Sequence, residues 1–197
     1  MSRIGVVGAG TWGMALARML SNNGNEVTVF SVVEKEIDEL NATRKLRNLP
    51  YMDIPEEIVF TKDKKTVTEN VDVLLLAVPS VFVRSTTSLL REDIRDGQII
   101  VDVAKGMEAE TTMAMSEVIL DEISKDGLHD HVEVVALSGP THAEEVAIDL
   151  PTTIVSACED EQIARYVQDV FTSRCMRVYT NSDKKGVELC GALKNIV

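Results

Sequence analysis

The feature that most constrains the fold of this chain is a short run of glycines close to its N-terminus. An apolar run at 4–7 leads into the glycines, and a helix-competent apolar segment follows at once. In such a strand–turn–helix context, the spacing G-x-G-x-x-G predicts a dinucleotide-binding site rather than an ordinary turn. Gly8 permits the tight turn, Gly10 lets the backbone approach a pyrophosphate, and Gly13 allows the helix to pack close to the strand.

The helix that follows the glycines is expected to bind phosphate through its backbone. A helix N-terminus presents free N–H groups and a partial positive charge to an anion. Thr11 and Trp12 occupy the two variable positions of the pattern, so their N–H groups are expected to face the cofactor phosphates whatever their side chains are. Trp12 is the only tryptophan of the chain, and its fluorescence therefore offers a probe of cofactor binding.

The remainder of the chain alternates strand-like with helix-like runs, which is typical of a doubly wound, mostly parallel α/β sheet with crossover helices. The run at 73–78 is apolar on both faces and predicts a buried central strand. The expected strands are Ile4–Val7, Glu26–Phe30, Ile58–Phe60, Val73–Val78, Ile99–Val103, Val132–Leu137, Thr153–Ser156 and Met176–Tyr179. The expected helices are Thr11–Asn22, Glu34–Ala42, Val81–Leu90, Thr111–Ser124, one that begins at Thr141, Glu161–Phe171 and Asp183–Val197.

The pattern changes near residue 181, which suggests two domains. Residues 1–180 are expected to form a dinucleotide-binding domain, and residues 181–197 to begin a helical substrate domain. Apolar residues recur at helical spacing after Asp183, and the chain ends in mid-pattern without a stop signal. Either this helix folds onto the sheet, or the chain is the front part of a longer protein, which is the interpretation we favour.

Composition excludes several classes of partner. The formal net charge of −12 argues against nucleic acid, because a phosphate backbone demands a basic surface. No apolar run reaches membrane-spanning length, so membrane insertion is not expected. Cys158, Cys175 and Cys190 are odd in number and lack C-x-x-C spacing, so they are interpreted as buried, reduced thiols of a cytoplasmic protein.

Five segments, taken in order, resemble the NAD(P)-dependent glycerol-3-phosphate dehydrogenases. The resemblance implies an oxidoreductase with a Rossmann-like N-terminal domain and an all-helical second domain. It further implies NAD(P) as cofactor and reversible hydride transfer to carbon 2 of dihydroxyacetone phosphate, a phosphorylated small molecule, giving sn-glycerol 3-phosphate for glycerophospholipid synthesis. The segments are Gly8-Ala9-Gly10-Thr11-Trp12-Gly13, Ala77-Val78-Pro79-Ser80, Lys105-Gly106-Met107-Glu108, Ser138-Gly139-Pro140-Thr141 and Gly191-Ala192-Leu193-Lys194-Asn195.

The resemblance also sets an expectation for this chain by itself. The family's downstream arginine and asparagine, which grip the substrate phosphate, are absent from these 197 residues. We therefore expect the chain to bind cofactor with little or no turnover. The sequence leaves a homodimer of the full-length protein open.

Two lysines are the candidates for chemistry at the carbonyl. From the residues alone, Lys194 is equally well a snorkelling helix-end lysine, and Lys105 is more simply a solvated loop lysine. By resemblance, Lys194 matches the catalytic lysine of the family, which acts as general acid in reduction and general base in oxidation, and it binds substrate. Lys105 matches a residue that contacts both substrate and cofactor. Two lysines at one carbonyl would lower each other's pKa and polarise the oxygen together.

Other site residues are carried by the resemblance. Gly139 and Thr141 match substrate contacts, and Ala143 matches a cofactor contact. Thr141 and Glu144 also have capping-box spacing, so a capping role for Thr141 is the simpler alternative and is compatible with binding. Phe82 matches an aromatic residue near the nicotinamide, with core packing as the alternative.

The choice between NAD and NADP turns on the end of the second strand. An NAD site usually places an acidic residue there, to bond the ribose 2′-hydroxyl. Here Ser31, Val32 and Val33 follow the strand, and the nearest acid is Glu34. The family often has a histidine or basic residue near position 32, so Val32 leaves the cofactor preference open. Because no carboxylate lies at the strand end, we expect a slight preference for NADP.

Two further readings of the chain remain as alternatives. One is a related reductase of the ketopantoate or 3-hydroxyacid type, against which the segment at 191–195 argues. The other is a non-catalytic nucleotide-binding module, against which the paired lysines argue. A metal site is not expected, because His129 and His131 lie in an acidic loop, are interpreted as solvated, and have no further ligands at suitable spacing.

Overall fold

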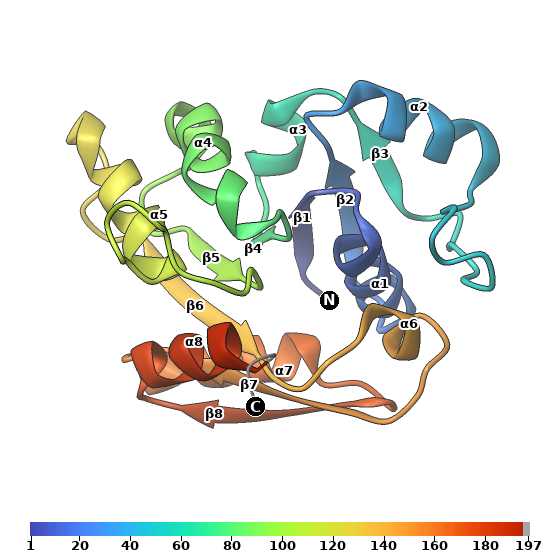
Figure 1. The fold of residues 1–197 in the computed structure, drawn as a ribbon. Helices are drawn as coiled ribbons and strands as arrows, with labels where there is room; N and C mark the ends of the chain where they lie inside the picture. The colour runs from blue at the N-terminus through green and yellow to red at the C-terminus, as the bar shows by residue number, and fades with distance from the viewer. Residues whose placement is uncertain (195–197) are drawn as a thin grey trace.

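The fold is a single twisted sheet with helices on both of its faces (Figure 1). The computed structural model describes residues 1–194, and within them eight strands form one sheet in the order β3-β2-β1-β4-β5-β6-β7-β8. Strands β1 to β6 all pair in parallel, while β7 pairs antiparallel to β6. The expectation of a doubly wound, mostly parallel α/β sheet is confirmed. The strands are β1 (Arg3–Val7), β2 (Glu26–Phe30), β3 (Val59–Thr61), β4 (Val73–Leu76), β5 (Ile99–Asp102), β6 (Glu133–Ser138), β7 (Thr152–Ala157) and β8 (Met176–Asn181).

The helices divide between two hydrophobic layers, one on each face of the sheet. Buried side chains of α1, α2 and α7 belong to one apolar cluster, and those of α3, α4 and α5 to the other. Leu74 and Leu75 of β4 are fully buried and point into different clusters, because successive side chains of a strand face opposite sides. The helices are α1 (Thr11–Asn22), α2 (Glu34–Thr43), α3 (Lys64–Thr68), α4 (Ser80–Leu90), α5 (Met115–Ile123), α6 (Ala143–Val146), α7 (Glu161–Phe171) and α8 (Lys184–Leu193).

The reversal between β6 and β7 determines where α8 lies. Strand β8 runs parallel to β7, so it ends near the amino edge of β6. At the start of α8, Lys184 donates a hydrogen bond to the carbonyl of Val134, near the beginning of β6. Near the end of α8, a Cβ on Gly191 would lie 2.5 Å from the hydroxyl oxygen of Ser138, the last residue of β6. Helix α8 therefore runs alongside β6 and delivers its last residues to the carboxyl edge of the parallel strands (Figure 1).

Two expected helix starts were wrong. Helix α5 begins at Met115 instead of Thr111, because the preceding residues form a loop in which Thr112 has a φ of 59° and Met107 bridges to Ala114. Helix α6 begins at Ala143 and is four residues long. The final helix is confirmed as far as Leu193, and its predicted continuation to 197 lies outside the described residues. Within residues 1–194, no helix is both long and apolar enough to cross a membrane.

Candidate functional site

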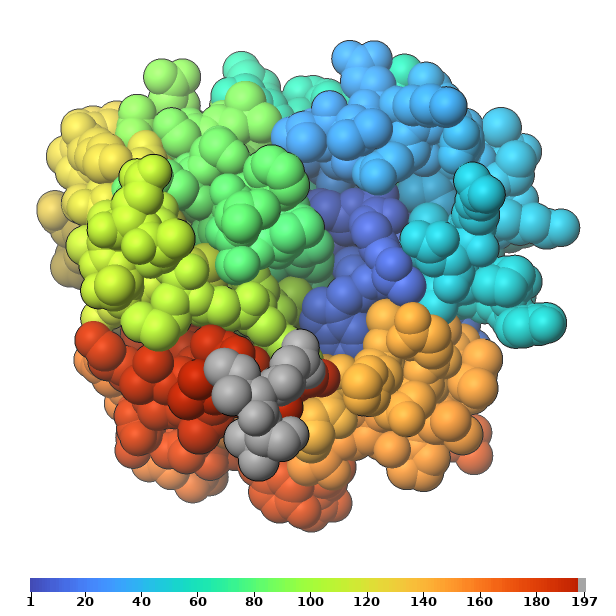
Figure 2. Space-filling view, viewed as in Figure 1, coloured from blue at the N-terminus to red at the C-terminus, as the bar shows by residue number. Residues whose placement is uncertain are grey.

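A cavity of about 460 Å³ opens at the carboxyl ends of β1, β4 and β5. In an open α/β sheet this edge is where ligands bind, in the crevice outside the strand ends. In Figure 2 the glycine-rich turn, in dark blue, lies at the bottom of a depression between the segment that contains α6 and the start of α4. The cavity is lined by Gly10, Thr11, Trp12, Ala77, Val78, Pro79, Val103, Ala104, Lys105, Thr141, His142 and Ala143.

The three glycines of the turn have different structural reasons to be glycine. Gly8 has a φ of 114°, and a Cβ on it would lie 2.5 Å from the carbonyl oxygen of Ala77. A Cβ on Gly13 would lie 2.1 Å from the carbonyl oxygen of Gly8. Gly10 has ordinary backbone angles, and no heavy atom of residues 1–194 lies within 4 Å of the position that its Cβ would take. The first and third glycines therefore allow close packing, while the second leaves open space on the cavity side.

Among the described residues, the N-terminus of α1 has no side-chain cap at its N-cap position. Gly10 is its N-cap and has no side-chain oxygen, and the first turn contains no acidic residue. The N–H groups at a helix start need an acceptor, and their partial positive charge favours an anion. The turn is thus suited to a phosphate or pyrophosphate group in the cavity.

Lys105 lies in the loop after β5, at the wall of the cavity. Its Nζ donates hydrogen bonds to the carbonyl oxygen of Gly139, at 3.2 Å, and to the hydroxyl oxygen of Thr141, at 3.4 Å. Burial and, second to it, the neighbouring positive charge of Lys194 together lower the pKa of Lys105 to about 8. The solvated-loop interpretation of Lys105 is therefore wrong, because the amine is half-buried and bonded.

Lys194 contacts the same threonine through the threonine's backbone. Its Nζ donates a hydrogen bond to the carbonyl oxygen of Thr141 at 3.4 Å. Lys194 also lines a second cavity of about 470 Å³, together with Gly139 and one face of α8. The fold thus brings Lys105, Thr141 and Lys194 together, although the two lysines come from distant parts of the chain.

Thr141 does not cap a helix. His142 is the N-cap of α6 and makes no capping bond with its side chain, while the buried Thr141 hydroxyl accepts from Lys105. Close packing next to it requires glycine, since a Cβ on Gly139 would lie 2.8 Å from the carbonyl oxygen of Thr153. The capping role predicted for Thr141 is therefore wrong, and its side chain is committed to the lysine.

The two predicted cofactor contacts differ in their placement. Ala143 lines the cavity. Phe82 lies on α4 with 56% of its surface exposed, so the core-packing alternative is wrong for it. Phe82 is not among the residues that line the cavity.

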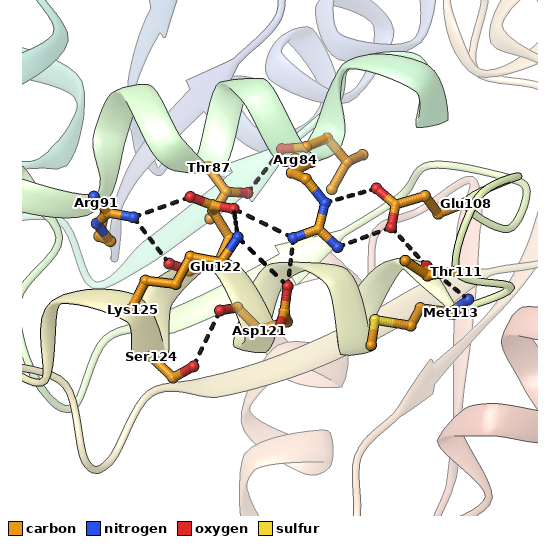
Figure 3. A network of polar contacts seen from close by, with 11 residues as sticks. Arg84, Thr87, Arg91, Glu108, Thr111, Met113, Asp121, Glu122, Ser124 and Lys125 are labelled. Carbon is orange, nitrogen blue, oxygen red and sulfur yellow. Dashed lines mark hydrogen bonds and ion pairs between the residues drawn. The ribbon is translucent and has the colours of Figure 1, made fainter.

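A charged network that involves the loop after Lys105 was missed by the sequence analysis (Figure 3). Arg84 of α4 donates to both carboxylate oxygens of Glu108, at 2.7 and 2.8 Å, and also to Asp121 of α5. Hydrogen bonds from Arg84 lower the pKa of Glu108 to about 2, and the same bonds raise the pKa of Arg84. The network ties the loop after Lys105 to two helices, and no local sequence pattern could reveal it because the partners lie on three elements.

The end of β2 also holds a carboxylate that local inspection missed. The buried Ser31 hydroxyl donates to Glu36 Oε2 at 2.6 Å and accepts from the backbone N–H of Val33 at 3.1 Å. Val32 and Val33 are both exposed beside it. Glu36 thus lies at the strand end although it comes later in the sequence than Glu34.

The histidines and cysteines form no metal site among the described residues. His129 is not solvated as predicted: its ring bonds the carbonyl oxygen of Ile94 at 2.7 Å and Asp126 at 3.0 Å, and only 4% of its side chain is exposed. In residues 1–194, no cluster of histidine, cysteine and acidic side chains could hold a metal ion. Cys158 is buried, but Cys175 is only partly buried and Cys190 is exposed, so the prediction of three buried thiols holds for the first alone.

Comparison with known proteins points in one direction. Residues 3–164 match the sequence model of a family described as NAD-dependent glycerol-3-phosphate dehydrogenase N-terminus. A curated relative from Lactobacillus delbrueckii subsp. bulgaricus, named glycerol-3-phosphate dehydrogenase (NAD(P)+) 2, is 64% identical over all of this chain and 58% of its own length. The glycerol-3-phosphate dehydrogenase (NAD(P)+) of Agathobacter rectalis is 44% identical over all of this chain and 57% of its own.

Solved structures give the same result. A crystal structure of glycerol-3-phosphate dehydrogenase from Coxiella burnetii matches with a TM-score of 0.86 and 33% identity, over 99% of this chain and 58% of that one. The chain thus spans a little over half the length of the curated relatives that it matches.

Proposed function

Because the chain belongs to the NAD-dependent glycerol-3-phosphate dehydrogenase family, matching its N-terminal part, we propose that it carries the cofactor site and the proton-transfer lysine of such an enzyme. The reaction is reversible hydride transfer between NAD(P)H and dihydroxyacetone phosphate, giving sn-glycerol 3-phosphate for glycerophospholipid synthesis. The observation that carries the proposal is the meeting of Lys105 and Lys194 at Thr141, beside a cavity that the glycine turn lines.

The residues of the cavity fit a dinucleotide. The uncapped N-terminus of α1 would hold the pyrophosphate, and the open space at Gly10 would admit it. Thr11 and Trp12 would contact it through their backbone, and Ala143 and Phe82 would border the nicotinamide half. When bound, the cofactor supplies or accepts the hydride.

The lysines supply the charge and the proton that the ketone oxygen requires. Negative charge develops on that oxygen as hydride arrives at carbon 2, so nearby cations stabilise the transition state. Lys194 would donate the proton in reduction and accept it in oxidation, and Lys105 would polarise the oxygen while it contacts the cofactor. Gly139 and Thr141 would position the substrate between them.

The rest of the expected organisation belongs to the same proposal. Residues 181–197 begin the helical domain that completes the substrate pocket, and the full-length protein forms a homodimer in the cytoplasm. The three free cysteines support a reducing compartment. This chain covers 58% of the length of the Lactobacillus relative.

The test is the oxidation of NADPH and NADH with dihydroxyacetone phosphate, by the protein extended to the full length of its relatives and by its Lys194→Ala variant. We expect kcat to fall at least about 100-fold in the variant, since positioned proton transfer contributes 10²–10⁴-fold. Cofactor binding should quench the Trp12 fluorescence of the 197-residue chain, and this chain should turn over little dihydroxyacetone phosphate. Equal rates in both proteins would remove Lys194 from the mechanism, and activity with ketopantoate alone would favour the related reductases.

For the cofactor we propose a modest preference for NADPH. Exposed Val32 and Val33 stand where an NAD site usually carries an acid, and Glu34 lies 3.4 Å from Lys62, which offsets its charge. The opposing group is Glu36, whose carboxylate contacts Ser31. We expect Kd to be lower for NADPH than for NADH, and Glu36→Gln to widen the ratio several-fold through NADPH alone. A lower Kd for NADH in the unchanged protein would contradict the preference.

A further inference from the structure

Helix α8 is held to helix α5 through a buried acid. Among the residues of α8, Glu188 is the one that is buried, with 7% of its surface exposed. Apolar residues usually take such a position, because burying a carboxylate costs free energy unless its oxygens are bonded. The partner of Glu188 therefore decides how α8 is placed.

Glu188 binds the N-terminus of α5. Its Oε1 accepts from the backbone N–H of Ser116 at 2.8 Å, and its Oε2 accepts from the Ser116 hydroxyl at 2.7 Å. The N-cap of α5 is Ala114, whose side chain has no acceptor. A carboxylate from another helix therefore does the work that a serine or aspartate N-cap usually does, and the helix dipole favours its charge.

The same helix also anchors the loop that carries Lys105. Asp121 and Glu122 of α5 accept from Arg84, which holds Glu108 in that loop (Figure 3). Helix α5 thus contacts both lysine-bearing segments: its last turn binds the Lys105 loop through Arg84, and its first turn binds α8.

The position of Glu188 along α8 relates it to Lys194. The two residues are separated by about 9 Å of helix axis, at 1.5 Å per residue. A rigid helix pinned at Glu188 places its last residues within a narrow range. Near the other end, Gly191 removes the side chain that would meet Ser138.

The charges that face Glu188 come from two elements. Asp102, at the end of β5, is buried beside it and accepts from the backbone N–H of Ala104 at 3.2 Å. Burial, with a smaller contribution from the charge of Glu188, raises the pKa of Asp102 to about 8. Lys185 of α8 lies near Glu188 but is paired with Glu117 at 2.8 Å on the surface. Below that pH the carboxyl of Asp102 is thus mostly protonated where it faces Glu188.

We propose that Glu188 is a positioning residue, which docks α8 on the N-terminus of α5 so that Lys194 is held beside Lys105. The proposal rests on the proposed function of these two lysines. It assigns to Glu188 no contact with substrate or cofactor.

The test measures the titration of the Lys105 amine in the 197-residue chain. Each protein is acetylated briefly across a range of pH, and the labelling of each lysine is read by mass spectrometry. In the unchanged chain Lys105 should label as an amine with a pKa near 8. In Glu188→Ala, α8 is no longer held on α5, so the Lys194 amine moves away from Lys105 and Lys105 becomes more solvated. We therefore expect the pKa of Lys105 to rise by about one unit and its labelling at pH 7 to fall about 10-fold.

Three further variants make the result specific. Lys194→Met removes the neighbouring charge directly and should raise the Lys105 pKa, and adding Glu188→Ala to it should give less than the sum of the two shifts. Lys185→Ala breaks an exposed ion pair across the same helix contact and should change nothing. Ser116→Ala removes one of the two bonds and should give an intermediate shift, which covers the case in which Glu188→Ala fails to fold.

The outcomes separate the two proposals. A shift in Lys194→Met with none in Glu188→Ala or Ser116→Ala would overturn the positioning role and leave the lysine pair intact. No shift in Lys194→Met would show that the amines do not meet, which would contradict the proposed function itself.

Discussion

Alanine in place of Gly13 is expected to destabilise the protein by about 3 kcal/mol or more, the upper range for overpacking a well-packed contact. The added Cβ would lie 2.1 Å from the carbonyl oxygen of Gly8 and 3.1 Å from the Cβ of Ala77. The first of these neighbours is backbone and cannot rotate away, so α1 must move off the sheet. Met14 and Leu16 of α1 are fully buried and would lose their packing. Urea unfolding at equilibrium measures the loss.

Gly10→Ala is the matched control for this substitution. No heavy atom of the described part of the chain lies within 4 Å of its Cβ position, and its φ of −72° suits alanine. We expect its free energy of unfolding to stay within about 0.5 kcal/mol of the unchanged protein, as for most surface changes. Its Kd for cofactor should nevertheless rise at least 10-fold, because the methyl group stands where the pyrophosphate approaches. Unchanged stability in Gly13→Ala, or unchanged affinity in Gly10→Ala, would contradict the respective role.

Asp102→Asn is expected to stabilise the protein increasingly as the pH rises from 4 to 8, by up to about 5 kcal/mol over that range. Asp102 has a pKa of about 8 in the folded chain and an ordinary low pKa when unfolded, so the folded state binds the extra proton between these values. The contribution of Asp102 to the free energy of unfolding is therefore greatest below its unfolded pKa, and it falls as the pH rises towards 8. Asparagine stays neutral throughout and can keep the bond from Ala104.

The measurement compares urea unfolding of the two proteins from pH 4 to pH 8. Other groups with shifted pKa values, such as Glu108, are common to both proteins and cancel in the difference. The difference should grow with pH by at most about 1.4 kcal/mol per unit, the limit for one proton. A difference that is constant with pH would show that Asp102 is ionised in the fold.

Much of the architecture was predictable because the local signals are strong. The predicted bounds of α1, β2 and α7 coincide with those of the structure. In α7 the start is set by Asp160, whose side chain accepts from the N–H groups of Gln162 and Ile163. Where a cap and an apolar period agree, the sequence determines the helix without tertiary help.

The predictions failed where a distant partner outcompetes a local one. Thr141 has the spacing of a helix cap, but its hydroxyl is taken by Lys105. His129 lies in an acidic loop, but its ring is buried on the carbonyl of Ile94. Spacing along the chain reports neighbours a few positions away, so neither bond had a signal in the sequence.

The candidate site divides in the same way. The glycine turn and the two lysines could be named from motifs, because each motif is local. The groups that hold the lysines could not, since Arg84 and Glu108, or Ser116 and Glu188, belong to elements that meet only in the folded chain. The family resemblance supplied the lysines, and the structure supplies their supports.

The reversal between β6 and β7 has a consequence for the order in which the site forms during folding. Lys105 precedes the reversal and Lys194 follows it, so the parallel strands β1 to β6 can pair while the two amines are still apart. Burial is the larger cause of the lowered pKa of Lys105, but the part that comes from the charge of Lys194 can arise only after the reversed unit has docked and α8 has returned along β6. In a refolding experiment, the final increase in the reactivity of that amine at neutral pH would therefore time the last step of assembly.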